Sequence, residues 1–144
     1  MYKRILVALE NSKADATILP HVAELAGRFQ SQLLLLHVAD GWVARNFNRL
    51  KLAESDEMKA DRAYLESVAA NLRAQGRDAS AQLALGDPPG EIVRVAETEH
   101  CDLIAMASHG HRFLADFFLG STINQVRHKT RIPILLVRAG SKTP

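Results

Sequence analysis

The sequence lacks disulfide pairs and long apolar runs, and each absence excludes a class of protein. Cys101 is the single cysteine, so no internal disulfide can form, and we expect a reducing cytoplasm. The longest strongly apolar run, residues 33–36, is far shorter than the ~20 residues that span a bilayer. The apolar run at residues 5–9 ends too early for a secretory signal. We therefore expect a cytoplasmic protein that does not associate with a membrane.

The net charge and the share of aromatic residues are also low. The formal net charge is only +2, and aromatic residues make up 6% of the chain. The sequence has no block of lysine and arginine and no basic patch interleaved with aromatic residues, which argues against nucleic acid as a partner. What remains is an ordinary globular composition, with 47% hydrophobic and 24% charged residues in a chain of 144. It predicts one domain over residues 1–140 and a flexible tail at 141–144.

Short apolar segments alternate with segments of helical periodicity. The expected strands cover residues 5–9, 33–38, 79–85, 102–107 and 132–137. The third strand alternates between apolar and polar residues, which favours a position at the edge of the sheet. Strands that alternate with helices predict an α/β fold with a five-stranded, parallel, doubly wound sheet. In such a sheet a ligand binds at the carboxyl ends of the strands where the strand order reverses, so the loops after the first and fourth strands are the candidates.

The expected helices have recognisable start and stop signals. Residues 12–15 have the spacing of a capping box with aspartate in place of glutamate, and Pro20 either kinks the first helix or marks its true start. A long helix covers residues 50–75 and ends at Gly76, and its polar first turns are expected to project into solvent. The last helix covers residues 121–129.

The segment from residue 106 to residue 122 has the features of an anion site. It reads M-A-S-H-G-H-R-F-L-A-D-F-F-L-G-S-T, with nine residues between Gly110 and the pair Gly120-Ser121. Glycines let the backbone approach a ligand closely, and the free amides of a helix N-terminus attract negative charge. We interpret this loop as a holder of nucleotide phosphates. The alternative is that Ser121 and Thr122 only cap the helix, since Thr122 and Gln125 have capping-box spacing.

Polar side chains near this loop have more than one interpretation. His109 and Arg112 either donate to phosphate oxygens or are solvated, and His111 is interpreted as solvated. Glu10, at the end of the first strand, accepts from a ribose or base, helps to hold a metal ion, or faces water. The His-x-His pair suggests a metal, but no third ligand has a telling spacing, so no metal site is predicted. A single carboxylate is not an acid/base pair, so no hydrolase is predicted either.

Other nucleotide-binding and catalytic templates are missing. The sequence has no G-x-x-x-x-G-K-[ST], no G-x-G-x-x-G after the first strand and no G-x-S-x-G. A phosphoacceptor domain would need clustered acids after the first strand, where Glu10 stands alone. A slow ATPase or a self-phosphorylating enzyme would need a base or an acceptor, and neither is evident. The sequence therefore favours a binding protein over an enzyme.

Five stretches give the chain a family resemblance. They are residues 3–9, His37-Val38, Gly86-Asp87-Pro88, residues 107–121 and residues 133–138. On these stretches the chain resembles the universal stress protein family, over essentially its whole length. ATP-binding members of that family have G-x-x-G, nine residues and then G-[ST], and Gly110, Gly120 and Ser121 match with the gap intact. Ala107 stands at the first glycine, and Glu10 stands where the family has aspartate.

The resemblance implies a Rossmann-like fold of the adenine nucleotide alpha hydrolase-like type. It also implies ATP or another adenine nucleotide as the ligand, with or without magnesium, which Glu10 would contact indirectly. Val38 would hold the adenine edge through its backbone, and Met106 and Ala107 would flank the nucleoside. The implied nucleotide-binding set is Ala8, Leu9, Glu10, Val38, Met106, Ala107, His109, Gly110, Gly120, Ser121 and Thr122, of which the last four would cradle the phosphates.

The last strand carries the expected partner surface. By resemblance it pairs with its twin across a two-fold axis, and its apolar residues Ile134, Leu135, Leu136 and Val137 agree with a sheet edge that pairs with another chain. The favoured hypothesis is a homodimeric stress-response regulator that binds ATP. The alternative, motivated by Ala107, is a dimeric stress or interaction module of the same fold that binds no nucleotide. Neither hypothesis names a protein partner.

Overall fold

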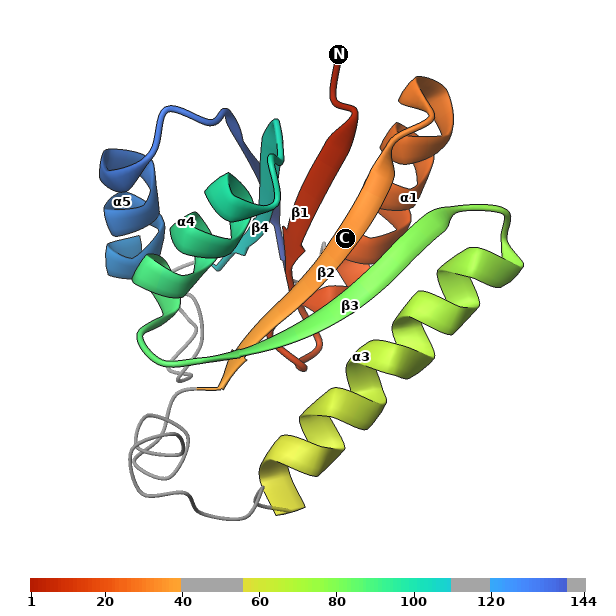
Figure 1. The fold of residues 1–144 in the computed structure, drawn as a ribbon, viewed down its shortest axis with the longest axis horizontal. Helices are drawn as coiled ribbons and strands as arrows, with labels where there is room; N and C mark the ends of the chain where they lie inside the picture. Colours follow the sequence, from red (N-terminus) through yellow and green to blue (C-terminus); the bar gives the residue numbers. More distant parts are fainter. Residues whose placement is uncertain (40–55, 110–119, 140–144) are drawn as a thin grey trace, which may run out of the picture.

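Strands and helices alternate along the chain in a computed structural model, which describes residues 1–39, 56–109 and 120–139. The strands are β1 (Arg4–Ala8), β2 (Gln32–Ala39), β3 (Asp78–Leu85), β4 (Leu103–Ser108) and β5 (Ile134–Arg138). The helices are α1 (Asp15–Phe29), α3 (Asp56–Ala74), α4 (Pro88–Thr98) and α5 (Gly120–Lys129). Figure 1 follows this order from red to blue.

The five strands form one parallel sheet in the order β3-β2-β1-β4-β5. The predicted α/β class is therefore confirmed, as is the edge position of the strand at residues 79–85. The order reverses between β1 and β4, which pair from Ile5↔Leu103 to Ala8↔Met106. In a doubly wound sheet such a reversal opens a crevice for ligands at the carboxyl ends of the strands, here called the carboxyl edge. The loops after β1 and β4 both start at this edge, as predicted.

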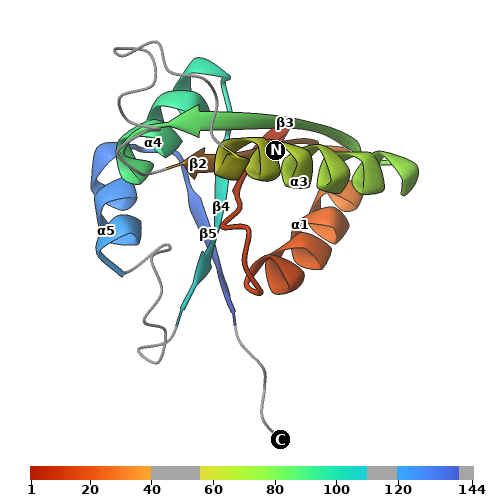
Figure 2. The same ribbon diagram turned by 90° about the horizontal axis from the view of Figure 1, so that it is seen from below.

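Helices cover both faces of the sheet (Figure 2). Successive side chains of a strand point to opposite faces, so the all-apolar β1 needs cover on both sides. Ile5 and Val7 pack in the cluster that holds the buried residues of α1 and α3. Leu6 and Ala8 pack in the cluster that holds those of α4 and α5. Burial of these two apolar layers is the main term that favours this fold.

Two helices differ in detail from the sequence prediction. Pro20 lies inside α1, which begins at Asp15, so the proline does not mark its start. The prediction that the first turns of α3 project into solvent is wrong for Met58 and Asp61, which are 3% and 7% exposed. Met58 packs against Ala39 at the end of β2, and Asp61 accepts a hydrogen bond from the loop after β1. The predicted helical residues 50–55 lie outside the described part of the chain.

The predicted stop of the long helix at Gly76 is confirmed. Gly76 has φ +84°, a left-handed conformation that glycine adopts without strain. Its amide donates to the carbonyl of Arg73, and the amide of Arg77 donates to that of Leu72, the pattern that ends helices. Among the described residues, no helix combines the length and apolarity needed to cross a membrane. The predicted tail, residues 141–144, is outside the described residues.

Candidate functional site

Two side chains from adjacent strands meet at the carboxyl edge, Glu10 after β1 and His109 after β4. Nε2 of His109 lies 2.8 Å from Oε1 and 2.7 Å from Oε2 of Glu10. The His109 side chain is 6% exposed and that of Glu10 is 0% exposed. Burial raises the pKa of the Glu10 carboxyl above its ordinary value, although the interaction with His109 opposes this rise. The two loops that sequence reasoning selected are thus joined by a buried pair.

The start of α1 carries a carboxylate that organises the loop after β1. Asp15 accepts hydrogen bonds from the amides of Glu10 (3.0 Å) and Asn11 (2.9 Å), and the Tyr64 hydroxyl donates to the same carboxylate. Burial and this carboxylate both raise the pKa of Tyr64. The predicted capping box at residues 12–15 is wrong, because Asp15 reaches back to the loop while Ser12 donates to Glu10. The N-terminus of α1 therefore holds a carboxylate of its own and is not free for an anionic ligand.

A second polar group ties the same loop to β2 and α3. His37 Nδ1 donates to the Leu9 carbonyl at 2.9 Å, since a carbonyl can only accept. Its Nε2 lies 3.4 Å from Oδ2 of Asp61, and the Asn11 side-chain amide donates to Oδ1 of Asp61 at 2.8 Å. Asn11 itself has φ +57°, a strained conformation that these contacts hold in place. Three elements therefore fix the conformation of this loop.

The Ala107 side chain is buried in the interior of the protein. It is 1% exposed and packs against Ala14, just before α1, and Ala139, just after β5. The Ala139 amide donates to the Ser108 carbonyl at 2.8 Å, which extends the pairing of β4 with β5 by one residue. Met106 points to the other face and is fully buried among α4 and α5 residues. The methyl group in place of the motif glycine thus fills a space inside the protein.

The N-terminus of α5 is the part of the described site best suited to an anion. It begins at Gly120 and has no acidic residue in its first turn, whereas α1, α3 and α4 each have at least one. The exposed Ser121 and the half-buried Thr122 place two hydroxyl groups in this turn. The alternative that Ser121 and Thr122 only cap the helix does not fit, because both residues lie inside α5, which includes Gly120. Gly110 lies outside the described residues, so its convergence with Gly120 stays a prediction.

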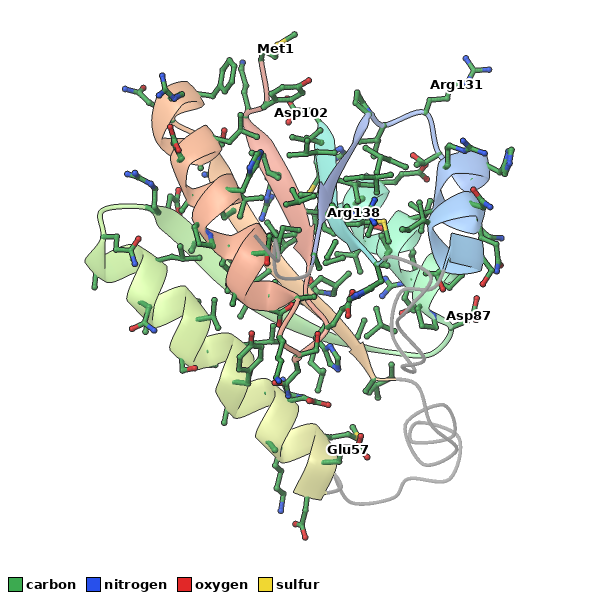
Figure 3. The ribbon with its side chains drawn as sticks, turned by 180° about the vertical axis from the view of Figure 1, so that it is seen from behind. Met1, Glu57, Asp87, Asp102, Arg131 and Arg138 are labelled. Carbon is green, nitrogen blue, oxygen red and sulfur yellow. The ribbon has the colours of Figure 1, made fainter. Side chains whose placement is uncertain are left out.

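The opposite edge of the sheet also has a hollow, of about 690 Å³. Figure 3 labels two of its residues, Asp102 and Arg131, at the end where the strands begin. Cys101, which also lines it, is 5% exposed, and burial raises the pKa of its thiol to about 11. This hollow lies at the opposite end of the strands from the carboxyl edge, so it is not the predicted ligand site. The complete lining is Glu97, Cys101, Asp102, His128, Lys129, Thr130, Arg131, Ile132 and Pro133.

A comparison with known families matches the Universal stress protein family over residues 1–138. The chain belongs to the universal stress protein family. A universal stress protein of Methanocaldococcus jannaschii is 30% identical over 158 aligned positions, which cover 96% of each chain. One of Bacillus subtilis is 26% identical over 148 positions, which cover 96% of this chain and 100% of the relative.

Solved structures agree with this family fold. The structure of the M. jannaschii protein superposes with a TM-score of 0.76 at 28% identity and covers 99% of both chains. A universal stress protein from Archaeoglobus fulgidus, solved in complex with dAMP, has a TM-score of 0.69 at 22% identity over 94% of this chain and 98% of its own. Another, solved in complex with cAMP, has a TM-score of 0.69 at 17% identity over 96% and 98%. At these identities, the two nucleotide complexes show only that this chain shares their fold.

The residues that the family resemblance implies for nucleotide binding lie at the carboxyl edge, as far as the structure describes them. Ala8, the last residue of β1, pairs with Leu36 on β2 and with Met106 on β4, and both neighbouring strands continue past it, to Ala39 and Ser108. The residues of the implied set that are buried here are Ala8, Leu9, Glu10, Val38, Met106 and Ala107. Their side chains are thus largely used for packing or pairing, and a ligand would meet mainly backbone groups at this edge.

The Val38 backbone is directed toward the space past the end of β1. In a parallel pair, the amide and carbonyl of one residue point to the same neighbouring strand, and the direction alternates along the chain. The Leu36 carbonyl accepts from the Leu9 amide on the β1 side, and the Ala39 carbonyl accepts from the Gly86 amide on the β3 side. The backbone amide and carbonyl of Val38 therefore point toward the β1 side of β2. Because β1 ends at Ala8, no residue of that strand lies opposite them. A donor and an acceptor at this place suit the edge of a base.

A magnesium ion, unlike the nucleotide, does not suit the described side chains. Glu10 is the residue that the resemblance offers to the ion, and both its oxygens lie within hydrogen-bonding distance of His109. The described residues contain no cluster of three or more histidine, cysteine or acidic side chains that could hold a metal ion. The amides of α5 and the Val38 backbone fit a phosphate and a base without such an ion.

Sequence reasoning missed three residues that shape this site: Asp15 as a loop anchor, Asp61 and Tyr64. A signal for Asp61 was present. The buried face of α3 continues backward from Leu72, Val68 and Leu65 in steps of three and four residues, and the next steps reach Asp61 and Met58. An acid on an apolar stripe must have hydrogen-bond partners, which points to a network. The partners themselves are set by tertiary structure, which this pattern does not give.

Proposed function

We propose that this universal stress protein binds an adenine nucleotide at the carboxyl edge between β1 and β4 and acts as a homodimeric regulator. The observation that carries the proposal is the first turn of α5, which contains the motif Gly120-Ser121 and no acid. Partial positive charge at this helix end and the hydroxyl of Ser121 suit a phosphate. The nucleotide could be ATP, as in the motif-bearing members, or a monophosphate.

The base would lie against the backbone of Val38, past the end of β1. The direction of that backbone supports this position, and so does the anchored loop at residues 9–11, which leaves the crevice with a fixed wall. Family members solved with dAMP and with cAMP support adenine as the base. Their low identity to this chain means that the contacts proposed here depend on its own residues.

The dimer would form along the outer edge of β5. Within the described sheet, β5 pairs with β4 on one side and no strand covers the other. Leu136 is 47% exposed on this strand, a large apolar side chain where a monomer would favour a charge. A second copy of the chain, related by a two-fold axis, would cover both the open edge and the leucine.

The test of nucleotide binding is equilibrium dialysis of labelled ATP against the wild type and the variant Ser121→Asp. An aspartate at a helix start favours the helix, so the variant is expected to remain folded. It places negative charge where the phosphates would lie and should weaken ATP binding by about tenfold or more, about 1.4 kcal/mol. Ser67→Asp, a change at an exposed position of α3, is the matched control. A folded wild type that binds no ATP at millimolar concentration contradicts the proposal.

Two observations favour the alternative, a dimeric interaction module without a nucleotide. The Ala107 methyl group and the Glu10–His109 pair both fill space at the carboxyl edge. In that case the wild type is a dimer in solution and shows no shift in thermal unfolding with ATP, AMP or cAMP. Binding of any of the three nucleotides that is lost in Ser121→Asp excludes this alternative.

A further inference from the structure

All three acids described around the loop after β1 have protein partners for every carboxylate oxygen. Glu10 faces His109 with both oxygens and also accepts from Ser12. Asp15 accepts from two loop amides and from the Tyr64 hydroxyl. Asp61 accepts from Asn11 on one oxygen and lies 3.4 Å from His37 on the other. These side chains satisfy one another and leave no open carboxylate for a cation.

The Glu10–His109 pair is the contact that a cation would have to displace. A divalent ion such as Mg²⁺ binds carboxylate oxygens at about 2.1 Å and requires a nearly ideal octahedron of ligands. Nε2 of His109 already occupies the space between the two Glu10 oxygens, at 2.7 and 2.8 Å. Both side chains are almost fully buried, so separating them would leave a desolvated carboxylate without its donor.

We infer that His109 takes the place of the divalent cation at Glu10, so that this protein binds its nucleotide as the metal-free anion. The inference rests on the proposed function and specifies the chemical form of the ligand. The N–H of His109 donates a hydrogen bond to Glu10 at the place where a metal-bound site would have the cation. The phosphates then depend on the amides and hydroxyls at the start of α5, which do not require a metal.

His109 is accordingly a specificity-determining residue. With His109 in place, chelation of magnesium should leave the affinity for ATP unchanged. Removal of the imidazole in His109→Ala leaves Oε2 of Glu10 without its donor and Oε1 with only the Ser12 hydroxyl, so the carboxylate becomes available to a cation. Magnesium should then tighten ATP binding to this variant by about tenfold or more, the scale on which a partner of a metal ligand affects metal affinity.

The experiment measures ATP affinity of the full chain by equilibrium dialysis, once in EDTA and once in excess magnesium chloride. Equal affinity of the wild type under both conditions is the expected result. Binding that requires magnesium overturns the inference while leaving the proposed function intact. Absence of binding under both conditions contradicts the proposed function instead. The wild-type comparison decides these points even if His109→Ala does not fold.

A second measurement needs no nucleotide. Manganese(II) chloride alone is titrated into the protein and followed through the relaxation of water protons. The wild type should bind no Mn²⁺ at this edge, His109→Ala should bind it, and the double variant Glu10→Gln/His109→Ala should lose it again. His21→Ala, at an exposed position on α1, is the control for loss of a histidine and should behave as the wild type. Mn²⁺ binding by the wild type that Glu10→Gln abolishes overturns the inference.

Discussion

At the scale of single residues, Glu10 has the smallest exposed fraction, 1%, of the acids in the part of the chain that the structure describes. Its side chain is fully buried and has His109 and Ser12 as partners. Desolvation nevertheless outweighs these partners, since the pKa of Glu10 lies above its ordinary value of 4.5. A buried acid with a raised pKa lowers the stability of the fold where it ionises, and this cost should be visible as a dependence of the free energy of unfolding on pH.

The first prediction concerns Glu10→Gln. A raised pKa in the folded state contributes stability that is fully present below pH 4.5 and is lost as the pH rises through the folded pKa. Glutamine does not titrate, so the variant avoids this loss. The free energy of unfolding of the variant minus that of the wild type should increase with pH in this window, by about 1.4 kcal/mol for each tenfold difference in proton affinity. Urea unfolding at a series of pH values measures it.

The matched control for this prediction is Glu66→Gln, a change at an exposed position of α3. It removes one exposed carboxyl of the same type and serves as the reference for that change. A difference for Glu10→Gln that decreases as the pH rises would show that the ion pair with His109 outweighs burial.

The second prediction concerns Ala107→Gly, which restores the family glycine. The methyl group that it removes is buried against Ala14 and Ala139. Loss of one buried methyl group and the extra freedom of glycine in a strand should together lower the free energy of unfolding by about 1–2 kcal/mol. Thermal or urea unfolding checks this value. An increase in stability would mean that the alanine is strained at this position.

At the scale of elements, two glycines show that a residue type alone does not determine a role. Gly76 ends α3 with φ +84°, and apart from its two chain neighbours no described residue has an atom within 4 Å of the place where a Cβ would lie. Gly90 lies inside α4, and a Cβ there would make an ordinary contact of 3.8 Å with Asp87. One glycine is required by the backbone conformation and the other is not.

The third prediction compares these two glycines. Gly76→Ala should lower the free energy of unfolding by about 1 kcal/mol, because alanine is strained in the left-handed conformation. Gly90→Ala should raise it by about 0.5–1 kcal/mol, because alanine loses less entropy on forming a helix. Urea unfolding of both variants under the same conditions provides the measurement. Equal effects of the two substitutions would contradict the assigned conformations.

Hydrophobic patterning was sufficient to predict the elements and their order. Runs such as residues 5–9 are apolar on both faces, which only a strand with helices on both sides can bury. The ends of elements were less predictable, because caps depend on which side chain reaches which amide. Asp15 illustrates this point: its spacing from Ser12 indicated a local cap, yet it binds the loop before the helix.

The candidate site was predictable where it depends on glycines and strand ends, and unpredictable where it depends on contacts distant in sequence. The loops after β1 and β4 were identified from strand order. The contact between Glu10 and His109 joins residues 99 positions apart, and nothing in the local sequence of either residue specifies the other. The contact of Asp61 with Asn11, 50 positions apart, has the same origin.

At the scale of the whole molecule, the proposed nucleotide site and the proposed dimer edge belong to neighbouring strands. Ala107 and Ser108 on β4 pair with Val137 and Arg138 on β5. The amide of Ala139 continues this pairing to the Ser108 carbonyl. The two strands are thus joined by hydrogen bonds up to the carboxyl edge, so the proposed nucleotide site and the proposed dimer edge share one pair of strands.

The fourth prediction is that Leu136→Lys weakens the dimer. A lysine on an open strand edge opposes pairing with another strand, and here it would also face its own copy across the two-fold axis. The dissociation constant of the dimer should increase by at least about tenfold, as expected for loss of a central apolar contact. Sedimentation or light scattering over a range of concentrations measures it. Phe29→Lys, at another exposed apolar residue, is the control.

The buried thiol of Cys101 makes this protein a convenient template for chemical labelling. Its pKa of about 11 leaves almost no thiolate at neutral pH, and thiolate is the form that reacts with maleimides and spin labels. Because this is the single cysteine of the chain, a new one at position 136 or 121 would react alone, without removal of the native residue. Distances between probes could then be followed in solution against an unreactive background.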